Sequence, residues 1–393
     1  MIINSEKLSQ YYHKELHDKV LPFWIQNSID EEYGGYFTSL DREGNVFDTD
    51  KFIWLQCRQV WTFAKFYNEL DKNSDWLDIA QSGADFLIRN GRDNDGNWYF
   101  SLTREGKPLI QPYNIFSDCF AAMAFGQLYR ATGKEKYKEI AKLTFENILS
   151  RQHNPKRIYS KAYPGTRNLQ SFALPMILSN LVLELEEVLE EEQVESTIDH
   201  AIKTVMEVFY LEELDVILEN VNKDGTFSDT YDGRLHNPGH VLEAMWFMMD
   251  LGFRRGDNVL IKKAVDISLS TLEKGWDKVY GGIYYFMDIK GHPPQQLEWD
   301  QKLWWVHLEA MVAALKGFAF TGNIKMADWF VRLHEYATAR FPDPEFGEWY
   351  GYLNRQGEVL LPLKGGKWKG CFHVPRGLFQ IETVLKSIIK NEI

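Results

Sequence analysis

The chain has 393 residues, of which 45% are hydrophobic, and 44 Lys and Arg against 56 Asp and Glu give a formal net charge of −12. This balance argues against a nucleic-acid partner, which would need clustered Lys and Arg, and it offers no basic patch for a membrane surface. Cys57, Cys119 and Cys371 cannot all pair and show no CxxC spacing, so we expect a reducing, cytoplasmic setting and no disulfide framework or zinc site. No apolar run of about 18 residues predicts a membrane span, and the polar N-terminus is unlike a signal peptide.

Segments with helical spacing of apolar residues follow one another along the whole chain. They predict twelve helices, near residues 6–24, 51–71, 74–90, 115–131, 135–151, 168–187, 191–209, 237–253, 257–274, 301–320, 324–339 and 373–390.

Loops rich in aromatic residues and glycine recur between pairs of these helices. Four copies are clear: Glu32–Gly44, Asp95–Gly106, Tyr280–Gly291 and Phe346–Gly357. Two weaker copies are Arg157–Gly165 and Glu219–Asp229, and the marker glycines of the six copies recur at intervals of 59 to 66 residues. Alternating aromatic and polar residues before a glycine predict short β-hairpins.

Six units of two helices and a hairpin predict an all-α fold, an (α/α)6 barrel of twelve helices with the hairpins at one mouth. The helix after each hairpin is expected in the inner ring. The main competitor is an open superhelix of helical repeats, but such repeats are usually shorter. No linker interrupts the pattern, so residues 1–393 are expected to form a single catalytic domain.

If the hairpins share one mouth, the first turns of the inner helices converge on one pocket, where helix N-termini offer free N–H groups. The polar and aromatic residues near these starts are Arg58, His240, Glu243, Trp304, Trp305, His307, Glu309, His373 and Arg376. A lone histidine is usually structural, but His240 and His373 both come early in inner helices. His307 is the weaker candidate, because Trp304, Trp305 and Glu309 compete for the same wall.

Two imidazoles, an arginine and a carboxylate suit the inversion of a carbon next to a carbonyl. The proton must leave from one face and return on the other, which requires two acid/bases, and imidazole serves both roles near neutral pH. Arg58 would stabilise the negative charge on the carbonyl oxygen, and Glu243 or Glu309 would orient a histidine or bind a sugar hydroxyl. His240 and Glu243 lack an evident third ligand, so no metal is expected.

The sequence resembles the N-acylglucosamine 2-epimerase family, especially its bacterial members. The matching blocks span nearly the whole chain and include DKFIWLQCRQVWTF, HNPGHVLEAMWFM, HPPQQLEWDQKLWWVHLE and KGGKWKGCFHVPRGLF. The resemblance implies an (α/α)6 barrel that interconverts N-acetyl-D-glucosamine and N-acetyl-D-mannosamine, with Arg58, His240, Glu309 and His373 as essential residues.

Further expectations concern binding and assembly. Glu243, Trp304, Trp305, Arg376 and Asn168 are expected to bind the substrate. The resemblance also implies that ATP activates the enzyme without being consumed and that the protein is a homodimer. The sequence itself shows no ATP site, because KGGKWKG lacks P-loop spacing.

Three alternatives remain open at this point. One is a related epimerase or aldose–ketose isomerase acting on mannose or cellobiose. Another is a glycoside hydrolase, which would use two carboxylates such as Glu243 and Glu309. The third is a non-catalytic binding module, in which His373 would have no activity to lose.

Overall fold

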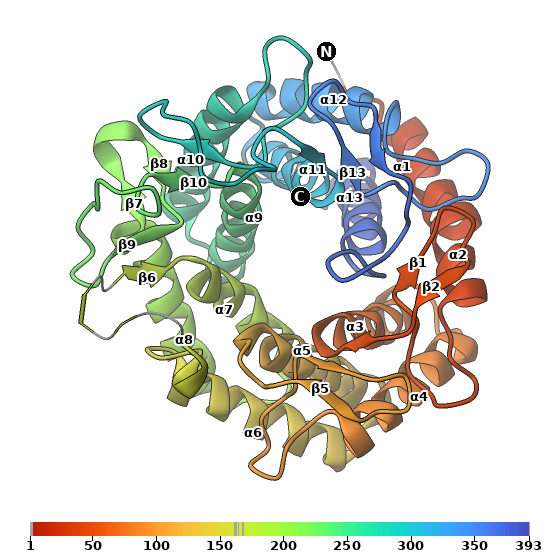
Figure 1. The fold of residues 1–393 in the computed structure, drawn as a ribbon. Coiled ribbons are helices and arrows are strands. Elements are labelled where there is room, and N and C mark those ends of the chain that lie inside the picture. The colour runs from red at the N-terminus through yellow and green to blue at the C-terminus, as the bar shows by residue number, and fades with distance from the viewer. Residues whose placement is uncertain (1–2, 161–162, 164, 167–168, 393) are drawn as a thin grey trace.

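The computed structural model describes residues 3–160, 163, 165–166 and 169–392, and its helices form two concentric rings (Figure 1). The inner ring contains α3 (Ile53–Glu69), α5 (Ile115–Thr132), α7 (Ala173–Glu184), α9 (Pro238–Arg255), α11 (Trp304–Thr321) and α13 (His373–Lys390). The outer ring begins with α1 (Ser5–Lys14), a π-helical segment (Glu15–Val20) and α2 (Leu21–Asn27), which run on without a break. It continues with α4 (Ser74–Asn90), α6 (Glu135–Arg151), α8 (Glu191–Lys203) with its π-helical end (Thr204–Val208), α10 (Asn258–Gly275) and α12 (Ile324–Thr338). The expected (α/α)6 barrel of twelve helices is confirmed.

The two rings differ in how much of each helix is buried. In α11 every residue from Trp304 to Gly317 is buried, whereas α4 buries one face and leaves its polar residues toward solvent. Small residues let the inner helices approach closely: a Cβ on Gly377 of α13 would lie 2.9 Å from a methyl group of Leu308 on α11. Helix starts are fixed by Asn and Asp side chains that accept backbone N–H groups, at Asn4, Asn73, Asn114, Asn237, Asp257 and Asn323.

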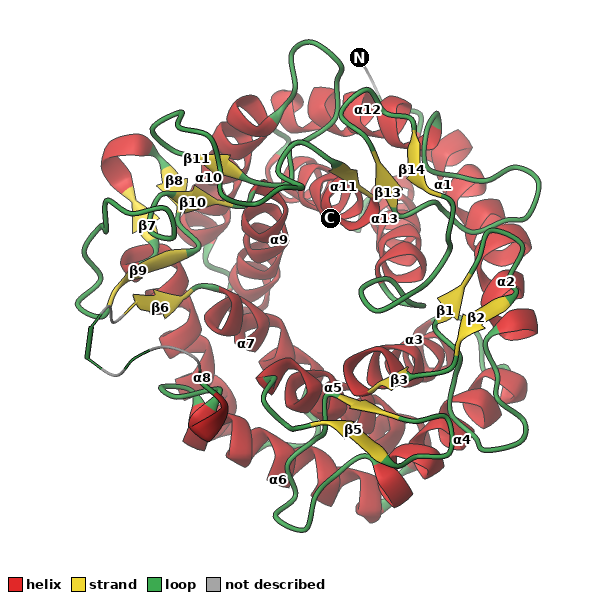
Figure 2. Ribbon diagram, in the orientation of Figure 1, coloured by secondary structure: helices red, strands yellow, loops and turns green. Residues whose placement is uncertain are grey.

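The strands gather at one mouth of the barrel (Figure 2). Three loops form the expected hairpins: β1 (Ser39–Leu40) with β2 (Val46–Asp48), β4 (Ser101–Leu102) with β5 (Pro108–Ile110), and β13 (Tyr352–Leu353) with β14 (Val359–Leu361). Two hairpins gain a third strand from the residues that enter an inner helix, β3 (Lys51–Phe52) and β12 (Lys302–Leu303). The marker glycines 44, 106, 165, 225, 291 and 357 all have φ between 77° and 96°, which is the reason that glycine recurs there.

The remaining strands pair differently from the expectation. Within the loop 280–291, β11 (Met287–Asp288) pairs with β10 (Leu235–His236), which precedes α9. Similarly, β9 (Asn220–Asn222) pairs with β6 (Leu169–Ser171). This pairing explains why α7 begins at Ala173, whereas helical spacing predicts a start near residue 168. A separate short pair, β7 (Tyr210–Leu211) and β8 (Val216–Ile217), follows α8.

The ring closes between the first and last units of the chain. Arg42 of the first hairpin donates to Asp343, which follows α12, at 2.8 Å, and the buried Lys364 ammonium lies 3.1 Å from the same carboxylate. Equivalent groups join Asp30 to Lys51 and Arg104, and Asp277 to Lys302 and Arg355. The same Asp–Lys–Arg arrangement therefore links hairpins of neighbouring units and also links the first unit to the last. We call this junction of the first and last units the seam.

Two sequence expectations about the environment can be compared with the structure. Cys57, Cys119 and Cys371 are buried free thiols. Within the described part of the chain, no helix combines the length and apolar character that a membrane span requires.

Candidate active site

A cavity of about 600 Å³ opens where the first turns of all six inner helices meet. Aromatic and apolar side chains make most of its wall, and a few polar groups point inward. Its lining comprises Trp54, Arg58, Phe116, Phe120, Ala173, Met176, Ile177, His240, Glu243, Tyr285, Glu298, Gln301, Leu303, Trp304, Trp305, Tyr352, Leu361, Trp368 and His373. An aromatic cup with few convergent polar groups is typical of a small-molecule site.

His240 is held by a carboxylate that sequence reasoning did not identify. Asn237 accepts the His240 N–H and Pro238 occupies the first turn of α9, which places the imidazole at the cavity wall. Its Nδ1–H donates to both carboxylate oxygens of Glu219, at 2.9 and 3.1 Å. Burial alone would lower the pKa of His240, but the Glu219 carboxylate more than offsets it and the pKa is raised. Because Nδ1 is engaged by Glu219, Nε2 is the nitrogen available for proton transfer.

His373 has a different environment at the start of α13. Its Nδ1–H donates to Glu309 at 2.8 Å, and Glu309 also accepts from Trp246 at 2.8 Å. Burial lowers the pKa of His373 well below its usual value, and the neighbouring guanidinium groups of Arg58 and Arg376 lower it further. The resting imidazole is therefore neutral, with Nε2 available as a base.

Arg58 lies among rings without a carboxylate partner in the described part of the chain. Its guanidinium carbon lies 4.4, 4.0 and 4.6 Å from the ring centres of Trp54, Phe120 and Phe372, and no described residue accepts a hydrogen bond from its Nε. Burial lowers its pKa to about 9, so the group is still cationic at neutral pH. A buried and unpaired cation is costly, and an anionic ligand would satisfy it.

Trp305 is a neighbour of both imidazoles. Its ring centre is 5.3 Å from that of His240 and 5.8 Å from that of His373, with interplanar angles of 39° and 38°. The indole N–H groups of Trp54 and Trp304, both in the cavity lining, have no hydrogen-bond partner among the described residues. Buried donors without partners favour a ligand rich in oxygen.

Three of the sequence candidates lie behind the wall. Arg376 is not in the cavity lining; its Nη2 donates to Glu243 at 2.5 Å and to Glu309 at 2.6 Å. Glu309 is also outside the cavity lining, and it accepts a hydrogen bond from His373 on the side away from the cavity. His307 is fully buried, with Nδ1–H donating to the Leu303 carbonyl and Nε2 accepting from the backbone of Ile283. Burial lowers the pKa of His307 to about 3, which suits a neutral structural residue. Asn168 lies outside the described residues.

Metal binding within the cavity does not fit the side chains. Glu243, Glu309 and His373 bring one ligand atom each within 4.8 Å of the others. The Arg376 guanidinium, however, bonds to both carboxylates and occupies the position that an ion would need. The same contact keeps the two glutamates together, with Glu243 in the cavity lining and Glu309 behind it, which does not suit a hydrolase that flanks the scissile bond with carboxylates.

The fold defines the class as an (α/α)6 barrel with a cavity at its mouth. A cellobiose 2-epimerase from Bacillus thermoamylovorans has the same fold, with a TM-score of 0.84 and 22% identity, over 97% of this chain and 100% of that one.

The sequence comparisons are more specific. The model of the N-acylglucosamine 2-epimerase (GlcNAc 2-epimerase) family matches residues 35–374. N-acylglucosamine 2-epimerases of Bos taurus and Homo sapiens are 40% and 39% identical over 95% of this chain and 90% and 89% of their own. The chain belongs to the N-acylglucosamine 2-epimerase family, and the expectation of an epimerase is confirmed.

Proposed function

We propose that this enzyme interconverts N-acetyl-D-glucosamine and N-acetyl-D-mannosamine by inverting C2 of the opened sugar. The observation that carries the proposal is the pair of imidazoles, each fixed by its own carboxylate, next to Trp305 in the lining of one cavity. The identity to the bovine and human N-acylglucosamine 2-epimerases supports the N-acetylated substrate.

The two histidines begin the reaction in different protonation states. Neutral His373 removes the C2 proton through Nε2, and the electron pair moves onto the aldehyde oxygen to give an enolate. Arg58 stabilises this oxygen by its charge. Protonated His240 then delivers a proton to the opposite face of C2, which completes the inversion. In the reverse direction the two imidazoles exchange roles.

The remaining polar residues bind or position. Glu243 and the indole N–H of Trp304 line the cavity and are proposed to bind sugar oxygens. Trp305, also in the lining, is proposed to stack on the carbon face of the sugar. Asn168 is a further proposed substrate contact. Glu309 and Glu219 fix the tautomers of the two imidazoles. Arg376 is proposed to act as a positioning residue, through Glu243 and Glu309.

We also propose that residues 1–393 work as one catalytic domain in a cytoplasmic homodimer that ATP activates without being consumed. Buried free thiols support a reducing compartment. The lysine-rich stretch 364–370 does not fit a phosphate site, because the ammonium groups of Lys364 and Lys369 are buried against Asp343 and Glu348. An assay with and without ATP, and the mass in analytical ultracentrifugation, test these points.

Isotope exchange in heavy water tests the reaction and assigns the histidines. Wild-type enzyme should convert N-acetylmannosamine to N-acetylglucosamine carrying deuterium at C2, read by NMR. His240→Asn and His373→Asn should each lose epimerisation by about 10²–10⁴-fold. Each should still exchange the C2 proton of one epimer only, because one base remains on one face.

Two results would contradict the proposal. One is wild-type enzyme that forms neither product nor C2 deuterium from either N-acetylated sugar. The other is exchange of both epimers by a single variant, since that requires a one-base mechanism. Mannose and cellobiose in the same panel test the alternative substrates, and a ketose from mannose would indicate the isomerase.

A further inference from the structure

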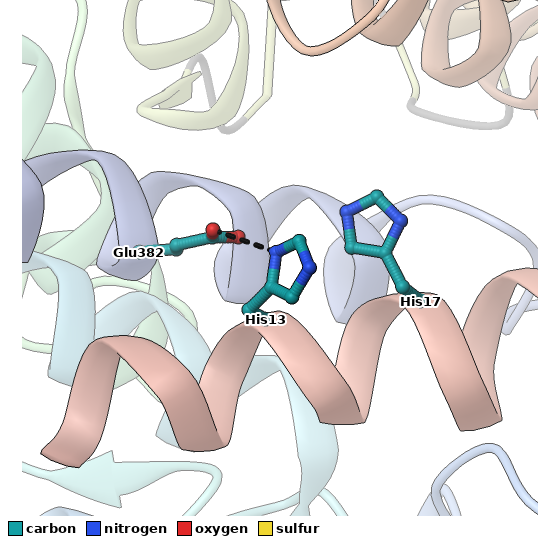
Figure 3. A group of neighbouring side chains, drawn as sticks. All are labelled: His13, His17 and Glu382. Atoms are coloured by element: carbon teal, nitrogen blue, oxygen red, sulfur yellow. Dashed lines mark hydrogen bonds and ion pairs between the residues drawn. The ribbon is translucent and has the colours of Figure 1, made fainter.

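A second group of metal-ligating side chains lies away from the cavity, between the first and last helices of the chain. His13 on α1 and His17 on the following π-helical turn project from one face toward Glu382 of α13 (Figure 3). His13 Nδ1 lies 3.0 Å from Glu382 Oε1, and the two imidazole centres are 4.3 Å apart. One ligand atom from each of the three residues lies within 4.8 Å of the other two.

The group contains polar atoms that the protein leaves unsatisfied. Glu382 is only 1% exposed, and within the part of the chain that the structure describes its Oε2 has no hydrogen-bond partner. Nε2 of His17 is also buried, and residues 3–160 and 169–392 offer it no hydrogen-bond partner. Such atoms carry a desolvation cost unless something binds them. The Lys386 ammonium, 2.6 Å from Glu382 Oε1, neutralises the carboxylate, but its side chain is half exposed and free to swing into solvent.

We propose that His13, His17 and Glu382 bind a divalent transition-metal ion such as Zn²⁺, which clasps the first outer helix to the last inner helix. Two imidazoles and one carboxylate are a ligand set that zinc takes, with water in the fourth position. Bonds of about 2.0–2.1 Å place the ligands of a tetrahedral ion roughly 3.4 Å apart, which small side-chain rotations reach from the observed separations. Half-exposed His13 gives the ion a path from solvent.

The position of the site predicts what the ion does. It joins α1 to α13 at the seam where the ring closes, so binding stabilises the folded chain. Glu382 lies nine residues beyond His373 on α13, about 14 Å along the helix axis. The ion is therefore too far away to take part in the reaction at C2. It also differs from the cavity cluster, where a buried arginine, rather than a displaceable lysine, holds the carboxylates.

Zinc titration of the metal-stripped full chain, followed by calorimetry and by thermal unfolding, tests the site. Wild-type protein should bind Zn²⁺ with a rise in Tm. His13→Gln and His17→Gln should each weaken this binding by about tenfold or more and remove the rise. His200→Gln, which alters an exposed histidine of α8, should behave like wild type.

A further variant is expected to strengthen Zn²⁺ binding, so it separates a specific effect on the site from loss of binding through misfolding. Lys386→Met removes the competing cation and should tighten Zn²⁺ binding. The proposal is overturned if wild-type protein shows no zinc-dependent rise in Tm, if the rise survives in both His13→Gln and His17→Gln, or if Lys386→Met weakens binding.

Discussion

At the scale of the residue, the two imidazoles of the cavity differ because their neighbours differ. His240 faces Glu219 with no arginine in contact, and its pKa is raised. His373 faces Glu309, but burial and the guanidinium groups of Arg58 and Arg376 outweigh the opposing charge of Glu243 and lower its pKa. The imidazole on one side of the cup therefore keeps its proton to higher pH than the imidazole on the other side, which is ready to take one. A two-base inversion needs this asymmetry at its start.

Glu219→Gln should abolish the asymmetry while keeping an acceptor for Nδ1–H. Without the carboxylate, burial acts unopposed and the pKa of His240 falls. Because His240 must be protonated to act as the acid, the fall of kcat on the alkaline side moves to lower pH, and kcat at pH 7–8 drops by about tenfold or more. Profiles of kcat against pH, in the direction in which His240 is the acid, measure the shift. Glu213→Gln, at an exposed position, is the control.

Arg58 is expected to be costly for stability and necessary for activity. Arg58→Met replaces a buried cation that no described carboxylate pairs with, so Tm should stay the same or rise, while kcat falls by about 10²–10³-fold through loss of charge stabilisation. Arg58→Lys keeps a charge but not the planar guanidinium, and should lie between. Differential scanning calorimetry and kcat are measured together. A marked fall in Tm with activity retained would show that Arg58 is structural.

At the scale of the element, the loops at the mouth are tied to the inner helices by buried ion pairs. Lys302 lies in β12, directly before α11, and its ammonium lies 3.3 Å from Asp277, which also accepts from Arg355 at 2.9 Å. Burial would raise the pKa of Asp277, but the hydrogen bond from Arg355 and the charge of Lys302 more than offset this and lower it. These contacts fix the start of α11, and thereby Trp304 and Trp305 at the cavity.

Lys302→Met should leave the Asp277 carboxylate buried with only one cation and lower the free energy of unfolding by about 3 kcal/mol. Adding Asp277→Asn should recover part of the loss. A carboxyl with a depressed pKa stabilises the fold above its unfolded pKa, about 3.9, and this contribution disappears as pH falls toward the folded value. Wild-type stability should therefore decline below about pH 4, and less steeply in Asp277→Asn. Urea unfolding at several pH values measures both effects, and equal slopes would contradict the assignment.

The elements were more predictable from the sequence than the contacts between them. Helical spacing and capping residues act locally, so all twelve helices could be placed, and the marker glycines were recognisable because a positive φ requires them. The exchange of strands that makes β9 pair with β6 leaves no local signal. It also positions Glu219, 21 residues from His240, and this is why the partner of His240 was missed while the neighbour on the same helix face, Glu243, was favoured. The repeated loop offered one signal, since Glu219 opens its weak fourth copy.

At the scale of the whole molecule, the barrel is a chain of neighbouring units with one seam. Units adjacent in sequence pack through consecutive inner helices, whereas the seam joins Arg42 to Asp343 and α1 to α13 across most of the chain. Contacts between distant residues carry the largest loop-closure cost and are expected late in folding. The first and last units therefore form the place where the ring is expected to open first.

Arg42 and Arg104 offer a matched comparison for this idea. Both make the same arginine–aspartate contact beside a buried lysine, with 39% and 32% of the side chain exposed, but Arg42 spans the seam and Arg104 joins the first two units. Contacts that form after the folding transition state affect unfolding rates most strongly. Arg42→Met should therefore accelerate unfolding in guanidinium more than Arg104→Met, with both followed by tryptophan fluorescence. Equal acceleration would mean that the seam is no weaker than any other junction, because the chemistry removed from the two sites is the same.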